Sequence, residues 1–379
     1  MLKTPTYNWR AFMLKLSTLV CRFYDALTSE DRVQVLIVDD SIYDRGRSKK
    51  VERLARIFDH NTRRYLSGFK LLQLGWSDGA SFVPLDFALR SSTQKKNRFQ
   101  EVTKTLDKRC CGYKRRKEAT VKTPTLLEEM VKRVLARGVR ADYLLMDSWS
   151  CFSGLIVRLS ENIPVICMAK NLNCVLYCHK NVHVRLSELY KRLRKRPGCA
   201  KILASTVVEM KGGTKVKVVF VRHRNTRKWL ALLCTDLELA DDEIVRIYGR
   251  RWGIEVFIKM AKQHLNLERE VQGRDYDGLI GHITIVMTRY IFLVFEQRNH
   301  DDPRTIGSLF YACCDEMADV CLLEAMQRLL TLVMDTIRST GEFSDKIISS
   351  LIDAVMGTAI DILNSHKACH AVINQKAAR

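Results

Sequence analysis

Apolar positions along the chain follow two periods, one typical of buried strands and one typical of helices. Residues 33–39 form a short β-branched run, and residues 66–92 hold two apolar runs around the turn sequence "WSDGAS". This pattern predicts a strand followed by a hairpin. The remaining elements of this part are predicted as helix, strand, helix and strand at 124–138, 141–147, 151–161 and 164–169. A meander followed by strand–helix–strand crossovers indicates an α/β fold with a mixed sheet covered by helices.

In the second half of the chain a β-rich segment is predicted first, and helices follow it. Residues 171–239 hold strand-like pieces separated by Gly, Asn and basic residues, which predicts a β-rich insertion. Helix resumes at about 241, where three acids in the first turn suit the helix dipole. The most apolar stretch, 279–296, contains His282 and Arg289, so we expect a buried core helix and no transmembrane span.

These patterns divide the chain into five expected parts. They are a short N-terminal helical remnant at 1–30, the first part of an α/β core at 31–170, the insertion at 171–239, the last core helix at 240–275 and a helical C-terminal region at 276–379. The basic stretch 95–124 has little apolar periodicity and is expected to be a mobile connection.

Charge narrows the class of partner. The chain has 379 residues with 63 Lys and Arg against 42 Asp and Glu, a formal net charge of +21. An excess of this size favours a polyanionic partner, of which nucleic acid is the commonest, over a small-molecule substrate.

The 13 cysteines are expected to be thiols, because no signal peptide precedes them. A zinc site at Cys174, Cys178, His179 and His183 is disfavoured, since no matching second pair follows and the apolar residues between them look like a strand.

One predicted helix, "RIYGRRWGIEVFIKMAK" at 246–262, has five of its polar residues on one narrow face. Tyr248, Arg251, Glu255, Lys259 and Lys262 fall on one stripe about 80° wide when each residue turns by about 100°. Glu255 lies four residues after Arg251 and four before Lys259, so a salt-bridged solvent-facing surface is one interpretation. A binding face that holds a phenol, a carboxylate and three cations together is the other.

Acidic residues also follow two predicted strands. Asp39 and Asp40 end the first strand and Asp147 ends the one at 141–147, so that these acids and Glu255 are more than a hundred residues apart in sequence. Taken singly, an acid after a strand is most often a turn former or helix cap. Carboxylates at the ends of adjacent strands converge, however, and three of them in one place need a cation. Oxygen ligands in small number suit Mg²⁺ or Mn²⁺, two of which can clamp a phosphodiester.

At these residues the sequence resembles the insertion-sequence DDE transposases with an RNase H-like core. The branch typified by insertion sequence four is marked by Tyr, two residues, Arg, three residues, Glu, six residues and Lys, and Tyr248, Arg251, Glu255 and Lys262 match this spacing. "IVDDS" at 37–41 resembles the first-aspartate motif of that family and "LLMDSW" at 144–149 the second.

The resemblance implies a site and a reaction. Asp40, Asp147 and Glu255 would hold two Mg²⁺ or Mn²⁺ ions for DNA strand cleavage and then strand transfer by a 3′-hydroxyl. The resemblance nominates Asp40 as the first ligand and Asp39 as its neighbour. Residues expected to contact DNA are Tyr248, Arg251, Trp252, Lys259 and Lys262, with core packing as an equal alternative for Trp252.

Partners and setting follow from the same resemblance. DNA, in the form of transposon ends and target, is the expected substrate, and a homodimer in a synaptic complex without a membrane is the expected assembly. The chain is expected in the cytoplasm with the nucleoid. The family generally carries a longer N-terminal helical region, so the chain is expected to be an N-terminally shortened copy. A catalytically silent DNA-binding derivative and an RNase H-like nuclease are the alternative functions.

Overall fold

The structure is a computed structural model, and it describes residues 2–27, 32–60, 62–102, 105–197, 200–223, 228–269, 273–299, 304–311 and 314. The chain divides into two compact units, Met1–Asp302 and Pro303–Arg379. The second unit lies almost wholly outside the described residues, and with it most of the predicted C-terminal helical region.

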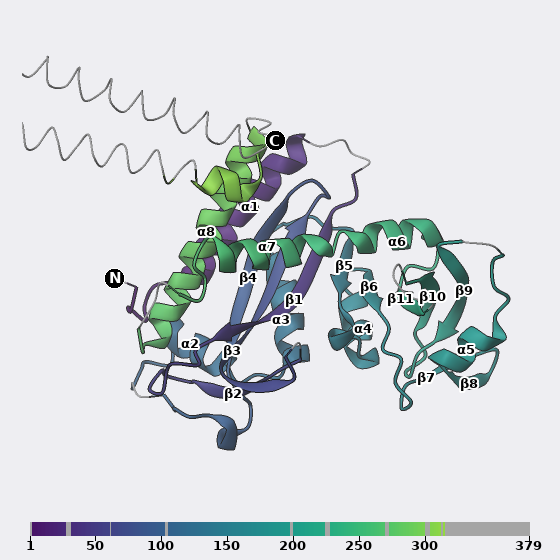
Figure 1. Ribbon diagram of the computed structural model, residues 1–379, viewed down its shortest axis with the longest axis horizontal. Helices are drawn as coiled ribbons and strands as arrows, with labels where there is room; N and C mark the ends of the chain where they lie inside the picture. The colour runs from purple at the N-terminus through teal and green to yellow at the C-terminus, as the bar shows by residue number, and fades with distance from the viewer. Residues whose placement is uncertain are drawn as a thin grey trace, which may run out of the picture. The chain divides into compact units, whose positions relative to one another are not determined.

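The first unit is built on a mixed sheet whose central strand is β1 (Figure 1). Strand β1 pairs antiparallel with β3 and parallel with β5, β5 pairs parallel with β6, and β4 pairs antiparallel with the outer edge of β3. The strands are β1 Val35–Asp44, β2 Ala55–Asp59, β3 Arg64–Ser77, β4 Phe82–Arg90, β5 Tyr143–Met146 and β6 Val165–Met168. The order β4-β3-β1-β5-β6, an antiparallel meander followed by two parallel strands, confirms the predicted RNase H-like mixed sheet.

The sheet continues through the insertion. Strand β11 pairs antiparallel with β6, and β10, β9, β7 and β8 follow in that order. These elements are β7 Leu176–His179, β8 Val182–Arg185, α5 Leu186–Arg192, β9 Ile202–Glu209, β10 Lys215–Arg222 and β11 Trp229–Cys234. Cys178 and His183 lie opposite each other on β7 and β8, but the described residues hold no group of three or more His, Cys, Asp or Glu side chains that could bind a metal ion.

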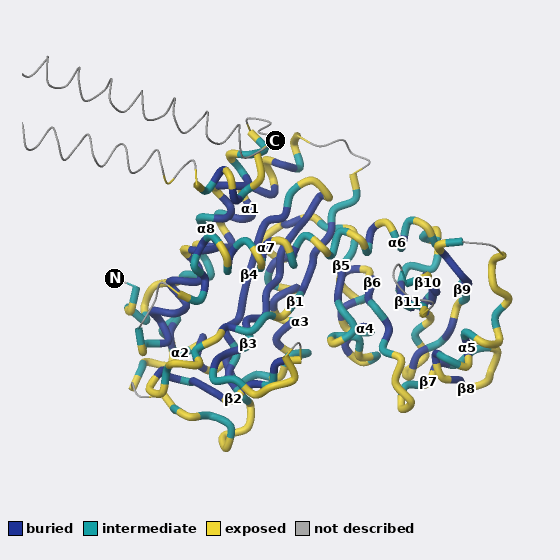
Figure 2. The backbone as a smooth tube through the Cα atoms, in the orientation of Figure 1, coloured by how far each residue is buried: buried dark blue, intermediate teal, exposed yellow. Residues whose placement is uncertain are grey.

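Helices cover the meander. Besides α5, the α-helices described in the first unit are α1 Trp9–Leu27, α2 Cys111–Glu118, α3 Thr123–Leu135, α4 Ser153–Ser160, α6 Asp241–Gly249, α7 Trp252–Gln263 and α8 Tyr276–Asn299. Helices α1, α3, α7 and α8 all contact β4, and α7 also lies against β1 (Figure 1). Strand β4 is buried along almost its whole length because helices cover it (Figure 2).

Helix α8 is long and apolar enough to cross a membrane by length and composition, but 67% of its most apolar window is buried inside the fold. His282 is itself buried at 3% exposure. Such burial agrees with the predicted core helix, since a span in a bilayer would present its apolar surface to lipid.

The prediction of a mobile connection at 95–124 is wrong for its second half. Residues 111–118 form helix α2, whose Arg116 is buried between Glu52 and Asp277. Arg116 donates to both carboxylates at 2.7–2.9 Å. The apolar period is missing because this helix is anchored by paired charges, which hydrophobic patterning does not register.

The helix that carries the polar stripe is interrupted. Helix α6 ends at Gly249 and α7 begins at Trp252, while Arg250 and Arg251 keep helical dihedral angles. The backbone N–H groups of Arg250, Arg251 and Gly253 each bond to the carbonyl three residues earlier. This tighter 3₁₀-type turn rotates Tyr248 relative to the rest of the stripe.

Candidate active site

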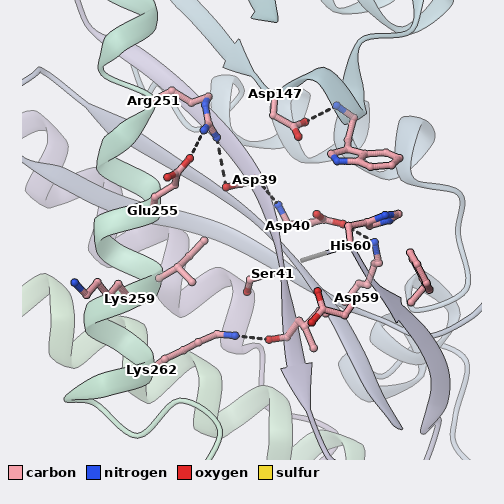
Figure 3. A pocket seen from close by; sticks show the side chains of 15 residues that line it. Asp39, Asp40, Ser41, Asp59, His60, Asp147, Arg251, Glu255, Lys259 and Lys262 are labelled. Atoms are coloured by element: carbon pink, nitrogen blue, oxygen red, sulfur yellow. Dashed lines mark hydrogen bonds and ion pairs between the residues drawn. The ribbon is translucent and has the colours of Figure 1, made fainter. Parts of the chain in front are cut away.

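A pocket of about 560 Å³ lies where the middle of β1 and the carboxyl end of β5 meet helix α7 (Figure 3). The prediction that Asp39 and Asp40 end the first strand is wrong, because β1 continues to Asp44. The lining residues come from four elements and the turn after β5: Asp39, Asp40, Ser41, Ile42, Phe58, Asp59, His60, Lys70, Asp147, Trp149, Arg251, Glu255, Ile258, Lys259 and Lys262. The fold therefore brings together the acids that the sequence separates by more than a hundred residues.

Asp39 and Asp40 stand on opposite sides of β1, because successive side chains of a strand alternate. Asp39 lies on the side of α7, where its Oδ2 accepts from Nη1 of Arg251 at 3.5 Å. Its Oδ1 accepts from the backbone N–H of Asp40 at 2.9 Å. Asp40 instead pairs with Lys70 of β3 at 3.3 Å. Of the two, Asp39 is thus the one in ionic contact with the helix that carries Glu255.

Asp147 follows β5 and caps the short 3₁₀ turn Ser148–Ser150. Its Oδ1 accepts from the backbone N–H groups of Trp149 and Ser150 at 2.9 and 3.2 Å. Both bonds go to the same carboxylate oxygen. Asp147 is therefore a helix cap, which was one of the two interpretations of the sequence. The cap does not use Oδ2, which has no bond to the turn.

Arg251 links the two walls of the pocket. Its guanidinium donates to the carboxylate of Glu255, one turn along α7, and reaches Asp39 on β1 (Figure 3). The salt bridge between Arg251 and Glu255 that the spacing suggested is present. It lines the pocket instead of an open surface, and Arg251 also pairs with Asp39. Arg251 supplies the positive charge that the converging carboxylates require.

The other cations of the stripe behave differently. Nζ of Lys262 donates to the carbonyl oxygen of Ile42 on β1 at 2.6 Å and lies 2.7 Å from Glu268. Lys259 lines the pocket, but its side chain extends away from the three acids (Figure 3). Lys262 therefore pins α7 to the strand, and Lys259 is the more available of the two for a ligand.

Tyr248 and Trp252, the two aromatic residues expected to contact DNA, have different surroundings. The hydroxyl of Tyr248 donates to the carbonyl oxygen of Met146, the residue before Asp147, at 3.3 Å. Trp252 is 64% exposed, which excludes the core-packing alternative. Tyr248 thus braces the end of β5, and Trp252 presents an open ring to solvent.

Burial and mutual repulsion perturb the acids. Burial raises the pKa of Asp39 to about 7, with the charges of Asp147 and Asp40 adding to the rise and Arg251 opposing it. Burial also raises the pKa of Asp147, to which the charge of Asp40 contributes. Carboxylates that resist ionisation beside one another are typical of a site that accepts a cation.

Several of the lining residues were not predicted as site residues, among them a lysine, a histidine and a tryptophan. Lys70 lies on β3, His60 follows β2, and Trp149 belongs to the turn that Asp147 caps. The imidazole of His60 lies 4.1 Å from the ring of Trp149, centroid to centroid. Strand β2 was not predicted, so nothing marked His60, whereas Trp149 stood visibly inside "LLMDSW".

The donor set suits Mg²⁺ or Mn²⁺ in chemistry, since it consists of carboxylate oxygens in small number. As they stand, the described residues hold no group of three or more His, Cys, Asp or Glu side chains close enough to bind a metal ion. Glu255 is turned to Arg251. Glu255 would be a metal ligand only with this ion pair opened.

Comparison with protein families agrees with this geometry. Residues 4–176 match the DDE superfamily endonuclease family. The match covers a little under half of the chain, runs from the segment before α1 to the start of β7, and includes Asp39, Asp40 and Asp147. It ends before the helix that carries Glu255. The matched segment is thus the part of the fold that holds the two aspartate-bearing strands.

No curated protein sequence matches the chain significantly. Among solved structures, the C-terminal lobe of a budding yeast Argonaute is similar at 10% identity and a TM-score of 0.22, covering 72% of this chain. The chain spans 60% of that lobe. The Drosophila P element transposase strand transfer complex is similar at 8% identity and a TM-score of 0.20, covering 77% of this chain and 72% of that one. The order and direction of strands β4-β3-β1-β5-β6 define the RNase H-like fold of this chain.

Proposed function

We propose that the chain is a DNA transposase of the DDE type, which cleaves a DNA strand with divalent metal ions and then joins a 3′-hydroxyl to a new phosphodiester. The observation that carries the proposal is the convergence of Asp39, Asp147 and Glu255 from β1, β5 and α7 in one pocket that cations also line. The match of residues 4–176 to DDE endonucleases supports the cleavage chemistry. The net charge of +21 supports a nucleic-acid substrate.

We propose Asp39, rather than Asp40, as the first acidic ligand. Asp39 shares Arg251 with Glu255, whereas Asp40 is neutralised by Lys70 on the neighbouring strand. Two bound Mg²⁺ or Mn²⁺ ions would supply activation of the attacking oxygen and charge neutralisation at the phosphate. The chain's own residues orient the substrate and hold the three carboxylates in reach.

We assign the cations of the pocket to the DNA backbone. Arg251 presents a fork that suits phosphate as well as carboxylate, and Lys259 adds a single charge at the rim of the pocket. Arg251 would be available to a phosphate when its carboxylate partners hold a metal ion. Lys262 and Tyr248 hold α7 and the end of β5 in place, and exposed Trp252 offers a stacking surface to DNA.

The proposal is tested with Glu255→Gln. We expect this variant to lose Mg²⁺-dependent nicking of supercoiled DNA by at least about 10²-fold, because it removes a metal ligand and keeps the side-chain shape. DNA binding in a gel-shift assay should persist. The matched control is Glu243→Gln on α6, which breaks a comparable Arg–Glu pair on the surface and should nick normally. Nicking by Glu255→Gln at the wild-type rate would refute the assigned site.

Strand transfer is tested separately with the DNA that surrounds the gene. The proposal expects terminal inverted repeats bounding the coding sequence, and pre-cleaved ends carrying a 3′-hydroxyl should be joined to a target plasmid. Nicking without joining of any such end would favour the RNase H-like nuclease alternative.

A further inference from the structure

Two cysteines meet directly behind the turn that carries Asp147. The thiol of Cys167 donates to Sγ of Cys151 across 3.7 Å. Cys167 is fully buried on β6, whereas Cys151 is half-buried just after the 3₁₀ turn Ser148–Ser150. Cys151 also lines a second pocket, of about 550 Å³, between the start of α4 and strands β7 and β9. A small oxidant can therefore reach Cys151 before it reaches Cys167.

The two cysteines differ in how firmly they are held. Cys167 stands in register with Met146 of β5 on one side and with Leu233 of β11 on the other. Cys151 sits at the end of the turn that Asp147 caps, and its backbone N–H donates to the carbonyl oxygen of Ser148 at 3.3 Å. A disulfide requires sulfur atoms about 2.05 Å apart. Closing the gap must therefore move the turn rather than the strand.

We propose that Cys151 and Cys167 form a reversible disulfide in the presence of a peroxide, and that this bond displaces the turn that positions Asp147. The geometry of the pair and of the turn carries this inference independently of the reaction catalysed. Its consequence for metal binding rests on the proposed function.

The chemistry begins at Cys151. The hydrogen bond from Cys167 lowers the pKa of the Cys151 thiol, and the backbone N–H and charge of Lys170 contribute to the same effect. The Cys151 thiolate attacks one peroxide oxygen, which gives a sulfenic acid and releases hydroxide, later protonated to water. The Cys167 thiol then attacks the Cys151 sulfur, and the sulfenic hydroxyl leaves as the second water once the thiol proton has been transferred. Two thiols are oxidised, and one peroxide is reduced to two waters.

The first experiment maps the bond in the full-length protein. Protein treated with a small molar excess of hydrogen peroxide and then alkylated is digested with trypsin without reduction. Cleavage after Arg140, Arg158 and Lys170 gives two neighbouring peptides, 141–158 and 159–170, each with one cysteine. We expect these two peptides to be found linked, and to separate after dithiothreitol treatment. Absence of the link, or capture of Cys151 by exposed Cys174 in its place, would overturn the proposal.

The second experiment follows the turn and the metal. We expect oxidation to change hydrogen–deuterium exchange in peptide 141–158, and to weaken Mn²⁺ binding at least about fivefold in calorimetry until dithiothreitol restores it. Cys151→Ser and Cys167→Ala should be insensitive to peroxide in both measurements, while Cys174→Ser, as control, should respond like the wild type. Unchanged exchange in the cross-linked protein overturns the displacement of the turn. If the reduced protein binds no Mn²⁺, the proposed metal site fails, and the exchange measurement still decides the displacement.

Discussion

Asp39 and Asp40 are neighbours on one strand, but they have different partners. Asp39 shares Arg251 with Glu255, and Asp40 is paired with Lys70 on β3. The family motif nominated Asp40, because in that motif the ligand aspartate directly precedes a Ser or Thr, here Ser41. Because successive side chains of a strand point to opposite sides, the two carboxylates are separated, and Asp39 is the one that lies beside the helix of Glu255.

This difference predicts unequal effects of two matched substitutions. Asp39→Asn should reduce Mg²⁺-dependent nicking at least about 10²-fold, because it removes a ligand of the proposed metal site. Asp40→Asn should reduce it by less than about tenfold, since Asp40 mainly neutralises Lys70. Initial rates on supercoiled plasmid measure both. The reverse order would restore Asp40 as the first ligand.

The raised pKa of Asp39 also predicts how stability depends on pH. In the folded protein its pKa is about 7, above the usual aspartate value, so folding favours the protonated form. The stability that this preference contributes is present at low pH and is lost as the pH rises to about 7. In metal-free buffer, Asp39→Asn should therefore be more stable than the wild type at pH 8, and the two should converge towards pH 4. Urea unfolding at several pH values measures the difference in unfolding free energy between the variant and the wild type. A difference that grows as the pH is lowered would contradict the raised pKa of Asp39.

Helix α2 shows how an element can be specified by charge rather than by apolar residues. Arg116 lies between Glu52, before β2, and Asp277, at the start of α8, all three almost fully buried. These bonds join three segments that are distant in sequence. Removing the cation leaves two carboxylates buried without a counter-charge, which is far more costly than losing a surface pair.

Arg116→Met should therefore lower the free energy of unfolding by about 3–5 kcal/mol. Arg109→Met is the matched control, because the Arg109 side chain is 93% exposed in the same basic stretch, and it should change stability by less than about 0.5 kcal/mol. Urea denaturation measures both variants. Equal stability of the two variants would mean that the buried ion pairs contribute nothing beyond packing.

Across the whole molecule the positive charge is concentrated in the insertion. Residues 171–239 contain 15 Lys and Arg against 4 Asp and Glu, about half of the net charge in less than a fifth of the chain. Lys191, Arg192, Arg194 and Lys195 follow one another at the end of α5 and are all exposed. A cluster of this kind is suited to the DNA backbone, which it would contact without reading sequence.

Replacing these four cations by Gln should weaken DNA binding and reduce the slope of log binding constant against log salt by up to about 3–4, because each lost phosphate contact contributes about 0.9. The control variant neutralises four exposed cations of the other basic stretch, Lys108, Arg109, Lys114 and Lys117. It should change the slope less, since Asp107 already pairs with Arg109 there. An unchanged slope in the insertion variant would remove the insertion from the DNA-binding surface.

The sequence by itself determined the elements that local patterning controls. The hairpin at 66–92, the strand before Asp147 and the insertion strands lie close to where the apolar runs predicted them, because burial of a strand leaves a readable run of apolar residues. Strand β1 begins where its apolar run predicted, but it continues past Asp39 and Asp40 to Asp44. Residue spacing likewise brought Arg251, Glu255, Lys259 and Lys262 to one face of the last core helix. Only the tertiary structure decided which acid of the pair faces Glu255, that Arg251 joins the two, and that α2 is a helix. These depend on strand register and on ion pairs between segments far apart in the chain, which no local pattern encodes.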